Sequence, residues 1–339
     1  MKKTILGIGI SLILILWVLW RVEWKLVWGS LGKVHWPYIF LYFFIFLIIQ
    51  FLRSFRWEIL LRPLLPVGQK TLFPITSVGL LALMILPARS GELARPYLLS
   101  QKKPIAMSAA LATIVVERVL DVLTILVFII LVSFSDILPA WVNRAGYIAM
   151  ALMGGILLFL ILLIGREQWV TNIAEMLFRP FSKRMLEISR NFICSFSLGA
   201  KILIHWRVMT NAFILSLALW GGVALLNFIM FFAFAFPVSL TAAFVLVIIV
   251  DLGLMIPAAP GFVGSFQFLC VVGLAIFGIG REEALSFSIL SHILQILFIV
   301  SLGLLFLPGM RISRFSFGER VPSIESPVSK YYPCEKPRL

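Results

Sequence analysis

The chain consists mainly of long apolar stretches, and its charged residues lie mostly in the short segments between them. Apolar stretches of helical length occupy 4–20, 36–61, 72–88, 105–134, 145–165, 208–236, 239–256, 262–279 and 284–307. Most of them approach the roughly 20 residues that a helix needs to cross a bilayer. The pattern therefore predicts an all-α polytopic membrane protein with about eight hydrophobic helical elements.

Two parts of this pattern, 72–96 and 239–279, are short and interrupted by residues that end helices. The interrupting residues are Pro87 and Gly91 in the first part, and Pro257, Pro260, Gly261 and Gly264 in the second. We expect 72–96 to be re-entrant, so that it enters the membrane and returns on the same side. The part 239–279 fits either two spans or one re-entrant hairpin, because both give the same overall topology.

Composition supports a membrane protein. Of the 339 residues, 61% are hydrophobic and 13% are charged, and the mean hydropathy is +1.07. Soluble domains are about half apolar and about a quarter charged. A soluble core of this length cannot bury so much apolar surface, so lipid must solvate much of it.

Positive charge predicts the orientation. The net charge is +14, and basic residues concentrate in 166–207 and after 308. Basic connections remain cytoplasmic in membrane proteins, which argues against nucleic-acid binding as the reason for the charge. The apolar run after Lys3 is expected to be an uncleaved first helix. We therefore predict a multi-pass protein of the cell (inner or plasma) membrane with both termini in the cytoplasm, which requires 72–96 to be re-entrant.

These observations divide the chain into a transmembrane domain, 1–310, and a basic, proline-containing tail, 311–339, which we expect to be disordered and cytoplasmic. The connection 166–207 carries apolar residues at helical spacing among basic ones. It fits a helix in the cytoplasmic head-group layer, or an amphipathic linker packed on the bundle. The apolar residues are Trp169, Val170, Ile173, Met176 and Leu177.

The two interrupted parts resemble each other. Pro-Ala-x-x-Gly begins at Pro87 and again at Pro257. Leu-Met-Ile precedes both copies, with one leucine in between in the first, and a long apolar stretch lies on either side of each. We interpret this as an inverted repeat, with repeat one at about 36–165 and repeat two at about 208–307. Broken helices in inverted repeats indicate a transporter binding site near the bilayer midplane. Chance similarity between apolar segments is the alternative.

The densest polar cluster accompanies the first interruption. Arg89, Glu92 and Arg95 lie within Pro87–Pro96. Arginine matches phosphate geometry through a bidentate fork, so the cluster is a candidate lipid-phosphate site. An ordinary cytoplasmic loop with solvated charges is the alternative.

A second cluster, Glu117, Arg118 and Asp121, lies inside the apolar stretch 105–134. Charges at membrane depth normally face a partner or a water-filled path, so the cluster either lines a translocation path or forms a structural ion-pair knot. Asp251 precedes the second interruption and needs a distant cation, such as Arg118 or Arg89, or a proton.

Gln267, after the second interruption, adds a neutral hydrogen-bonding group to the candidate path. Arg53 and Arg56, near the end of 36–61, are adequately explained by contact with lipid head groups.

Other chemistry has little support. Cys194, Cys270 and Cys334 lack metal-ligand spacing, and the histidines are far apart. His292 sits in an apolar run, where a histidine whose hydrogen bonds are satisfied within the bundle is the preferred interpretation and one that lines a polar path is the alternative. No nucleophile elbow, phosphate-binding glycine loop or zinc-protease helix occurs. We therefore predict no catalytic residue, no metal and no cofactor.

The motifs together resemble a known family. Leu-Pro-Ala-Arg-x-Gly-Glu-x-x-Arg-Pro at 86–96, Glu-Arg-x-x-Asp at 117–121 and Pro-x-x-Pro-Gly-x-x-Gly-x-x-Gln at 257–267 are similar to those of the flippase-like transmembrane region of lysylphosphatidylglycerol synthases. The resemblance covers roughly 5–310. It implies movement of lipid between leaflets by Arg89, Glu92, Arg95, Glu117, Arg118, Asp121, Pro257, Gly261 and Gln267. Since about 30 residues follow the last apolar stretch, we expect no lysyl-transferring domain.

The sequence therefore favours a lipid transporter in which Arg89 and Arg95 bind the phosphate of an anionic or phosphate-containing lipid. Glu92, Glu117 and Asp121 would position these arginines or exchange protons. A membrane enzyme acting on a lipid-linked phosphate, and an accessory subunit of a separate lipid-modifying enzyme, are the alternatives. The lipid, the direction of movement, the energy source and the oligomeric state are not determined by the sequence.

Overall fold

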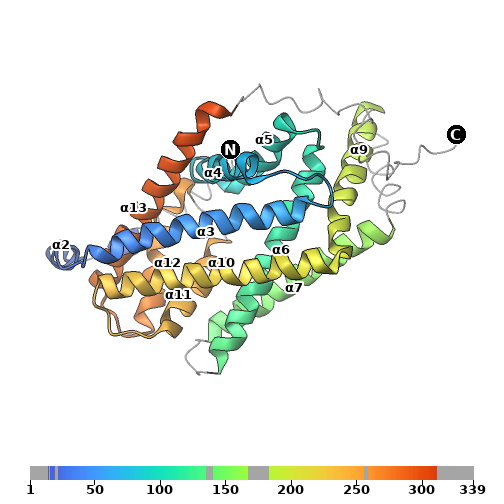
Figure 1. The fold of residues 1–339 in the computed structure, drawn as a ribbon. Coiled ribbons are helices and arrows are strands. Elements are labelled where there is room, and N and C mark those ends of the chain that lie inside the picture. The colour runs from blue at the N-terminus through green and yellow to red at the C-terminus, as the bar shows by residue number, and fades with distance from the viewer. Residues whose placement is uncertain are drawn as a thin grey trace.

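The computed structural model describes residues 14, 16–19, 22–134, 140–166, 183–255 and 259–310, and within these ranges it leaves aside the side chains at 87–89, 140, 143, 145, 149, 183–188 and 190. The described chain is helical (Figure 1), which confirms the predicted fold class. Its elements are α2 (Trp24–Gly32), α3 (Pro37–Leu61), α4 (Gln69–Ile85), η1 (Pro87–Leu93), α5 (Ala94–Lys102), α6 (Met107–Ser133), α7 (Ala140–Gly165), α9 (Lys183–Ala200), η2 (Lys201–Ile204), α10 (Trp206–Ala233), α11 (Leu240–Leu254), η3 (Pro260–Phe262), α12 (Ser265–Ala275), α13 (Arg281–Phe306) and η4 (Leu307–Gly309).

Four helices of the described chain are long and apolar enough to cross a membrane. They are Pro37–Leu61, Gly146–Gly165, Trp206–Ala233 and Arg281–Gly309. Large apolar side chains on their outer faces are exposed, among them Phe40 on α3 and Leu305 on α13. A bilayer accounts for this exposure, because hydrocarbon solvates such side chains.

Helices α3 and α10 lie side by side and run in opposite directions (Figure 1). The backbone N–H of His35, just before α3, donates to the carbonyl of Ala233 at the end of α10. At the other end of the pair, Arg56 donates to Ser216. Exposed tryptophans, Trp36 and Trp206, mark opposite ends of this pair, as in the aromatic belts of membrane proteins.

The segment 72–96 forms a hairpin. Leu86 has the extended conformation that a following proline imposes, so α4 ends there. The chain then returns along α4: a Cβ at Gly91 would lie 2.3 Å from the backbone nitrogen of Leu83, and one at Gly79 would lie 2.3 Å from Cγ of Arg95. The contacts pair residues in antiparallel order, so 72–96 turns back on itself after α4.

A second hairpin consists of α11, η3 and α12. With 15 and 11 residues, α11 and α12 are about 22 and 16 Å long, shorter than the roughly 30 Å of a hydrocarbon core. A Cβ at Gly253 would touch Leu269, and one at Gly273 would touch Leu246, so the two helices also run antiparallel. The part 239–279 therefore turns back on itself at η3.

The two halves repeat one order of elements. A long helix, a short helix, a 3₁₀ turn, a short helix and a long helix occur as α3–α4–η1–α5–α6 and again as α10–α11–η3–α12–α13. The contacts between the two sets are equivalent as well. The second helix of each set packs on the last helix of the other set, because α4 contacts α13 and α11 contacts α6. The first helices of the two sets, α3 and α10, are antiparallel, which is what an inverted repeat requires.

The connection between the halves packs on the bundle where it is described. Helix α9 contacts α6 so closely that a Cβ at Gly199 would lie 2.3 Å from the carbonyl oxygen of Ala109.

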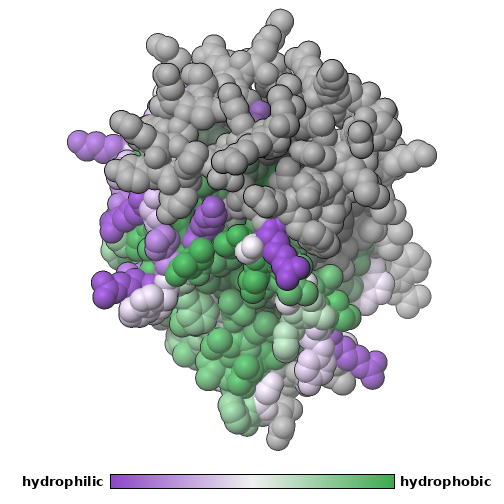
Figure 2. All heavy atoms as spheres, turned by 90° about the vertical axis from the view of Figure 1, so that its right-hand side faces the viewer, coloured by the Kyte–Doolittle hydropathy of each residue, from purple (hydrophilic) through white to green (hydrophobic). Residues whose placement is uncertain are grey.

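Figure 2 shows the face at the right of Figure 1, where apolar side chains gather over the lower part and hydrophilic ones lie at its margins. Trp169, Val170, Ile173, Met176 and Leu177, and the tail 311–339, lie outside the described residues.

Candidate functional site

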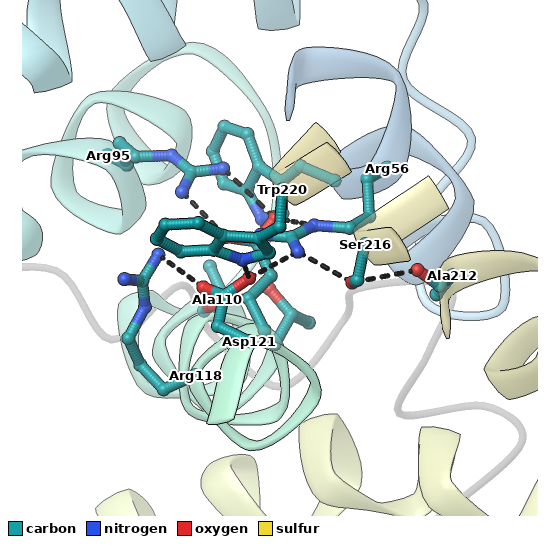
Figure 3. A network of polar contacts seen from close by, with 11 residues as sticks. Arg56, Arg95, Ala110, Arg118, Asp121, Ala212, Ser216 and Trp220 are labelled. Atoms are coloured by element: carbon teal, nitrogen blue, oxygen red, sulfur yellow. Dashed lines mark hydrogen bonds and ion pairs between the residues drawn. The ribbon is translucent and has the colours of Figure 1, made fainter. Parts of the chain in front are cut away.

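A buried network of arginines and carboxylates joins both halves of the protein (Figure 3). At its centre, Arg56 of α3 donates from Nη1 to Oδ1 of Asp121 at 2.5 Å, and its Nε lies 3.8 Å from Oε1 of Glu117. Arg56 and Glu117 are almost fully buried. Glu117 and Asp121 lie four residues apart on α6, so both carboxylates project from one helix face towards Arg56.

Arg95 holds the other side of Glu117. Its Nη1 lies 2.7 Å from Oε2 of Glu117 and its Nη2 lies 3.4 Å from Oε1, which is a two-pronged pairing. The guanidinium also lies over the ring of Trp57, 4.3 Å from the centroid. Trp57 in turn donates to Thr113 on α6. Arg95 is thus occupied by the protein itself, as a residue that fastens α5 to α3 and α6.

Helix α10 completes the network. Trp220 Nε1 donates to Oδ1 of Asp121 at 2.8 Å, and Ser216 accepts from Arg56 at 2.7 Å. On the other side of Asp121, Arg118 lies 3.1 Å from Oδ2. Arg118 also interacts electrostatically with Glu92 and Asp251. The network therefore connects the α6 carboxylates with η1, α10 and α11.

This arrangement corrects our interpretation of Arg56 as a residue in contact with head groups. Its side chain is only 1% exposed and pairs with both carboxylates. A buried charge is costly unless it is paired and hydrogen-bonded, and removing one partner from such a pair costs about 3–5 kcal/mol. The pairing has the geometry of an ion-pair knot, which was one of the two interpretations of Glu117, Arg118 and Asp121.

A cavity of about 220 Å³ lies beside this network. Most of its wall is apolar, from residues such as Phe46, Leu246 and Ile299, and the polar side chains at its wall come from several helices. The polar residues are Tyr42, Arg53, Trp220, Asn227, Asp251, His292 and Gln295. Because Trp220 belongs both to this wall and to the network of arginines and carboxylates, the network forms one boundary of the cavity.

The tips of the two hairpins meet next to this cavity. Helix α4 contacts η3, and a Cβ at Gly261 would lie 3.8 Å from the carbonyl oxygen of Met84. Gln267 holds the second tip: its Oε1 accepts from the N–H of Gly264 at 2.8 Å, and its Nε2 lies 2.9 Å from Nδ1 of His292. His292 also hydrogen-bonds the backbone of Gly261. Gln267 therefore shapes the turn.

The structure brings most of the predicted site residues together. Glu92, half-buried in η1, interacts with Arg118, and Asp251 interacts with Arg118 as well and lines the cavity. The Arg89 side chain and Pro257 lie outside what the structure describes. Among the described residues, no group of three or more His, Cys, Asp or Glu side chains is arranged to hold a metal ion.

Sequence reasoning missed Arg53, Arg56, Trp220 and Asn227. A usable signal existed for the arginines, because the carboxylates of 117 and 121 needed cations from outside their own helix. Arg53 and Arg56 are the basic residues inside the preceding long apolar stretch. Trp220 and Asn227 give no comparable signal, since tryptophan and asparagine occur in membrane helices for many reasons.

Long apolar helices, two broken hairpins and a buried polar centre define a multi-pass membrane protein. The chain belongs to the family described as the lysylphosphatidylglycerol synthase TM region, whose sequence profile matches residues 4–303. The resemblance noted from the motifs is thereby confirmed.

A relative is a "UPF0104 membrane protein" of Methanothermobacter thermautotrophicus (strain Delta H). The two chains are 23% identical over 296 residues, which cover 82% of this chain and 87% of the relative. No solved structure matches the chain.

Proposed function

We propose that this protein moves an anionic or phosphate-containing lipid between the leaflets of the cell membrane. The observation that carries the proposal is the cavity: it is mostly apolar, has charged and amide groups on its wall, and adjoins two broken hairpins. Amphiphilic ligands need such a mixture of surfaces. Broken helices that meet in the middle of an inverted repeat are the arrangement used by membrane transporters.

The size of the cavity suits a head group better than a whole lipid. About 220 Å³ is below the 300–1,000 Å³ typical of pockets that enclose a small molecule. In our proposal the head group therefore enters the protein and the acyl chains remain in the bilayer. The network of arginines and carboxylates forms one end of the proposed path, and the hairpin tips around Met84 and Gly261 form its narrow part.

We further propose that the basic end of the bundle faces the cytoplasm, together with both termini. This part of the bundle contains the last residues of α3 and α5 and the first residues of α4, α6 and α10. Its basic residues are Arg62, Lys70, Lys102, Lys103 and Arg207. Retention of basic residues on the cytoplasmic side favours this orientation. Labelling of a cysteine introduced at position 62 by an impermeant reagent, only after the membrane is opened, would support it.

Transport is tested in liposomes that contain the purified protein and head-group-labelled lipids. An impermeant reductant quenches the outer leaflet, and movement of inner-leaflet lipid gives additional quenching. Val223→Trp, on the cavity wall, should abolish the additional quenching. Leu225→Trp, on the same helix but 42% exposed on its outer face, is the matched control and should retain it.

The results separate the proposal from its alternatives. Quenching equal in the parent and Val223→Trp would contradict transport through this cavity, as would quenching no greater than in empty liposomes. An accessory subunit would instead co-purify with a lipid-modifying enzyme and move no lipid by itself. A lipid-phosphate enzyme would change the labelled lipid chemically, which thin-layer chromatography of the same samples detects.

A further inference from the structure

One face of α3 forms part of the cavity wall. Its residues Tyr42, Phe46, Ile49 and Arg53 follow one another at spacings of three and four, so they lie on one face of the helix. The first three present ring and alkyl surface together with one hydroxyl group. Arg53 places a guanidinium at the end of this face that lies nearest to the charged network.

Arg53 differs from the other arginines of this region in its partners. Arg56, Arg95 and Arg118 each have a carboxylate oxygen within salt-bridge distance. Among the ion pairs of the described residues, none includes Arg53. Its side-chain hydrogen bond is a long one, 3.5 Å from Nη1 to Oε1 of the neutral Gln50. The guanidinium therefore retains most of its donors for another acceptor.

The electrostatic surroundings of Arg53 are predominantly positive. Arg118, Arg56 and Arg95 repel its charge, whereas Asp121 attracts it. A half-buried cation among like charges is unfavourable unless an anion accompanies it. Asp251, the carboxylate on the cavity wall, interacts electrostatically with Arg118.

We propose that Arg53 is the residue that binds the lipid head group, and that it does so through the head-group phosphate. The inference rests on the proposed function and assigns the site within it. A guanidinium fork fits the oxygens of a phosphodiester, and the Asn227 side chain on the same cavity wall offers a neutral amide for head-group hydroxyls. Arg95, which the sequence suggested for this role, is occupied by Glu117.

The test measures binding rather than transport. Purified protein in an uncharged detergent is titrated with dihexanoyl phosphatidylglycerol below its micelle concentration, and binding is followed by calorimetry. Dihexanoylglycerol, which lacks the phosphate, and inorganic phosphate, which lacks the chains, are titrated in parallel. The variants are Arg53→Gln, Arg53→Lys, Asp251→Asn and Arg62→Gln; the last is the matched control, because Arg62 follows the same helix with a side chain 57% exposed.

We expect Arg53→Gln to weaken phosphatidylglycerol binding at least about tenfold, because it removes charge-assisted hydrogen bonds. Arg53→Lys, which keeps the charge but loses the fork, should lie between Gln and the parent. Arg62→Gln should bind as the parent does. Asp251→Asn should bind at least as tightly as the parent, since it removes a negative charge near the phosphate. Melting temperatures close to that of the parent show that the variants are folded.

Several results would overturn the assignment. They are parental affinity in Arg53→Gln, equal weakening in Arg62→Gln, or dihexanoylglycerol binding that is as strong as phosphatidylglycerol binding and as sensitive to the substitution. Inorganic phosphate binding as tightly as the lipid would make this a free-phosphate site instead. Failure of this assignment can be told apart from failure of the proposed function. If the parent protein moves lipid but Arg53→Gln binds lipid normally, only the assignment of Arg53 is contradicted. If binding depends on Arg53 but the protein moves no lipid, only the proposed transport is contradicted.

Discussion

Gly79 and Arg95 are in such close contact that a Cβ atom at position 79 would lie 2.3 Å from Cγ of the arginine. The absence of a side chain at Gly79 lets Arg95 pass directly over α4. The guanidinium thereby reaches Glu117 on α6 and the ring of Trp57 on α3. A glycine in one arm of the first hairpin thus determines where a charge in the other arm is placed.

Gly79→Ala should destabilise the protein by about 1–3 kcal/mol, the usual cost of overpacking. The conflicting atom lies near the Arg95 backbone, so relief of the clash must shift the whole side chain away from Glu117. The midpoint of unfolding by SDS, followed by circular dichroism, measures the effect. Gly221→Ala is the control, because nothing lies within 4 Å of its Cβ position and alanine favours helix there. Equal midpoints for the two variants would refute the prediction.

Arg56→Met should cost about 3–5 kcal/mol, because it leaves Asp121 and Glu117 buried without their shared cation. Arg62→Met, which makes the same change just after the same helix, removes an exposed pair with Glu58 and should cost less than about 1 kcal/mol. SDS unfolding of both variants gives the comparison. A small loss for Arg56→Met would mean that the network does not stabilise the bundle.

Gly261 has φ of +68°, in the left-handed region that side chains disfavour. Its Cβ position is open, with the nearest atom 3.8 Å away, so a substitution there should cost backbone strain alone. We expect Gly261→Ala to lose about 1–2 kcal/mol, and Gly261→Asn to lose less because asparagine tolerates this conformation. Thermal melting in detergent ranks the two; alanine equal to or better than asparagine would show that the turn is held differently.

Gln267→Met should destabilise the second hairpin by about 1–3 kcal/mol, because methionine fills the space but leaves the Gly264 N–H and the His292 ring without their partner. Gln267→Glu keeps an acceptor for Gly264 and should lose less. Hydrogen exchange in the peptides that span 259–275 reports the local effect. Unchanged exchange in Gln267→Met would indicate that Gln267 does not hold this turn.

Much of the architecture is predictable from the sequence. Runs of apolar residues gave the positions of the long helices, since a membrane helix satisfies its own backbone and needs only apolar side chains outside. Proline and glycine at 87 and 91 indicated where α4 ends, because their effect on the backbone is local, and the distribution of basic residues indicated that 72–96 returns to the same side. The motifs at 86–96, 117–121 and 257–267 are also local in sequence, and they indicated the family.

Tertiary structure alone decided how the polar groups are paired. The partners of Arg56 are 65 and 160 positions away, and no local pattern specifies which buried carboxylate receives which arginine. The same holds for the packing of α11 against α12, and for the cavity, which exists only where several helices meet. Hydrophobic length and helix-breaking residues act locally and are therefore determined by the sequence, whereas charge pairing at membrane depth depends on distances that only the packed bundle fixes.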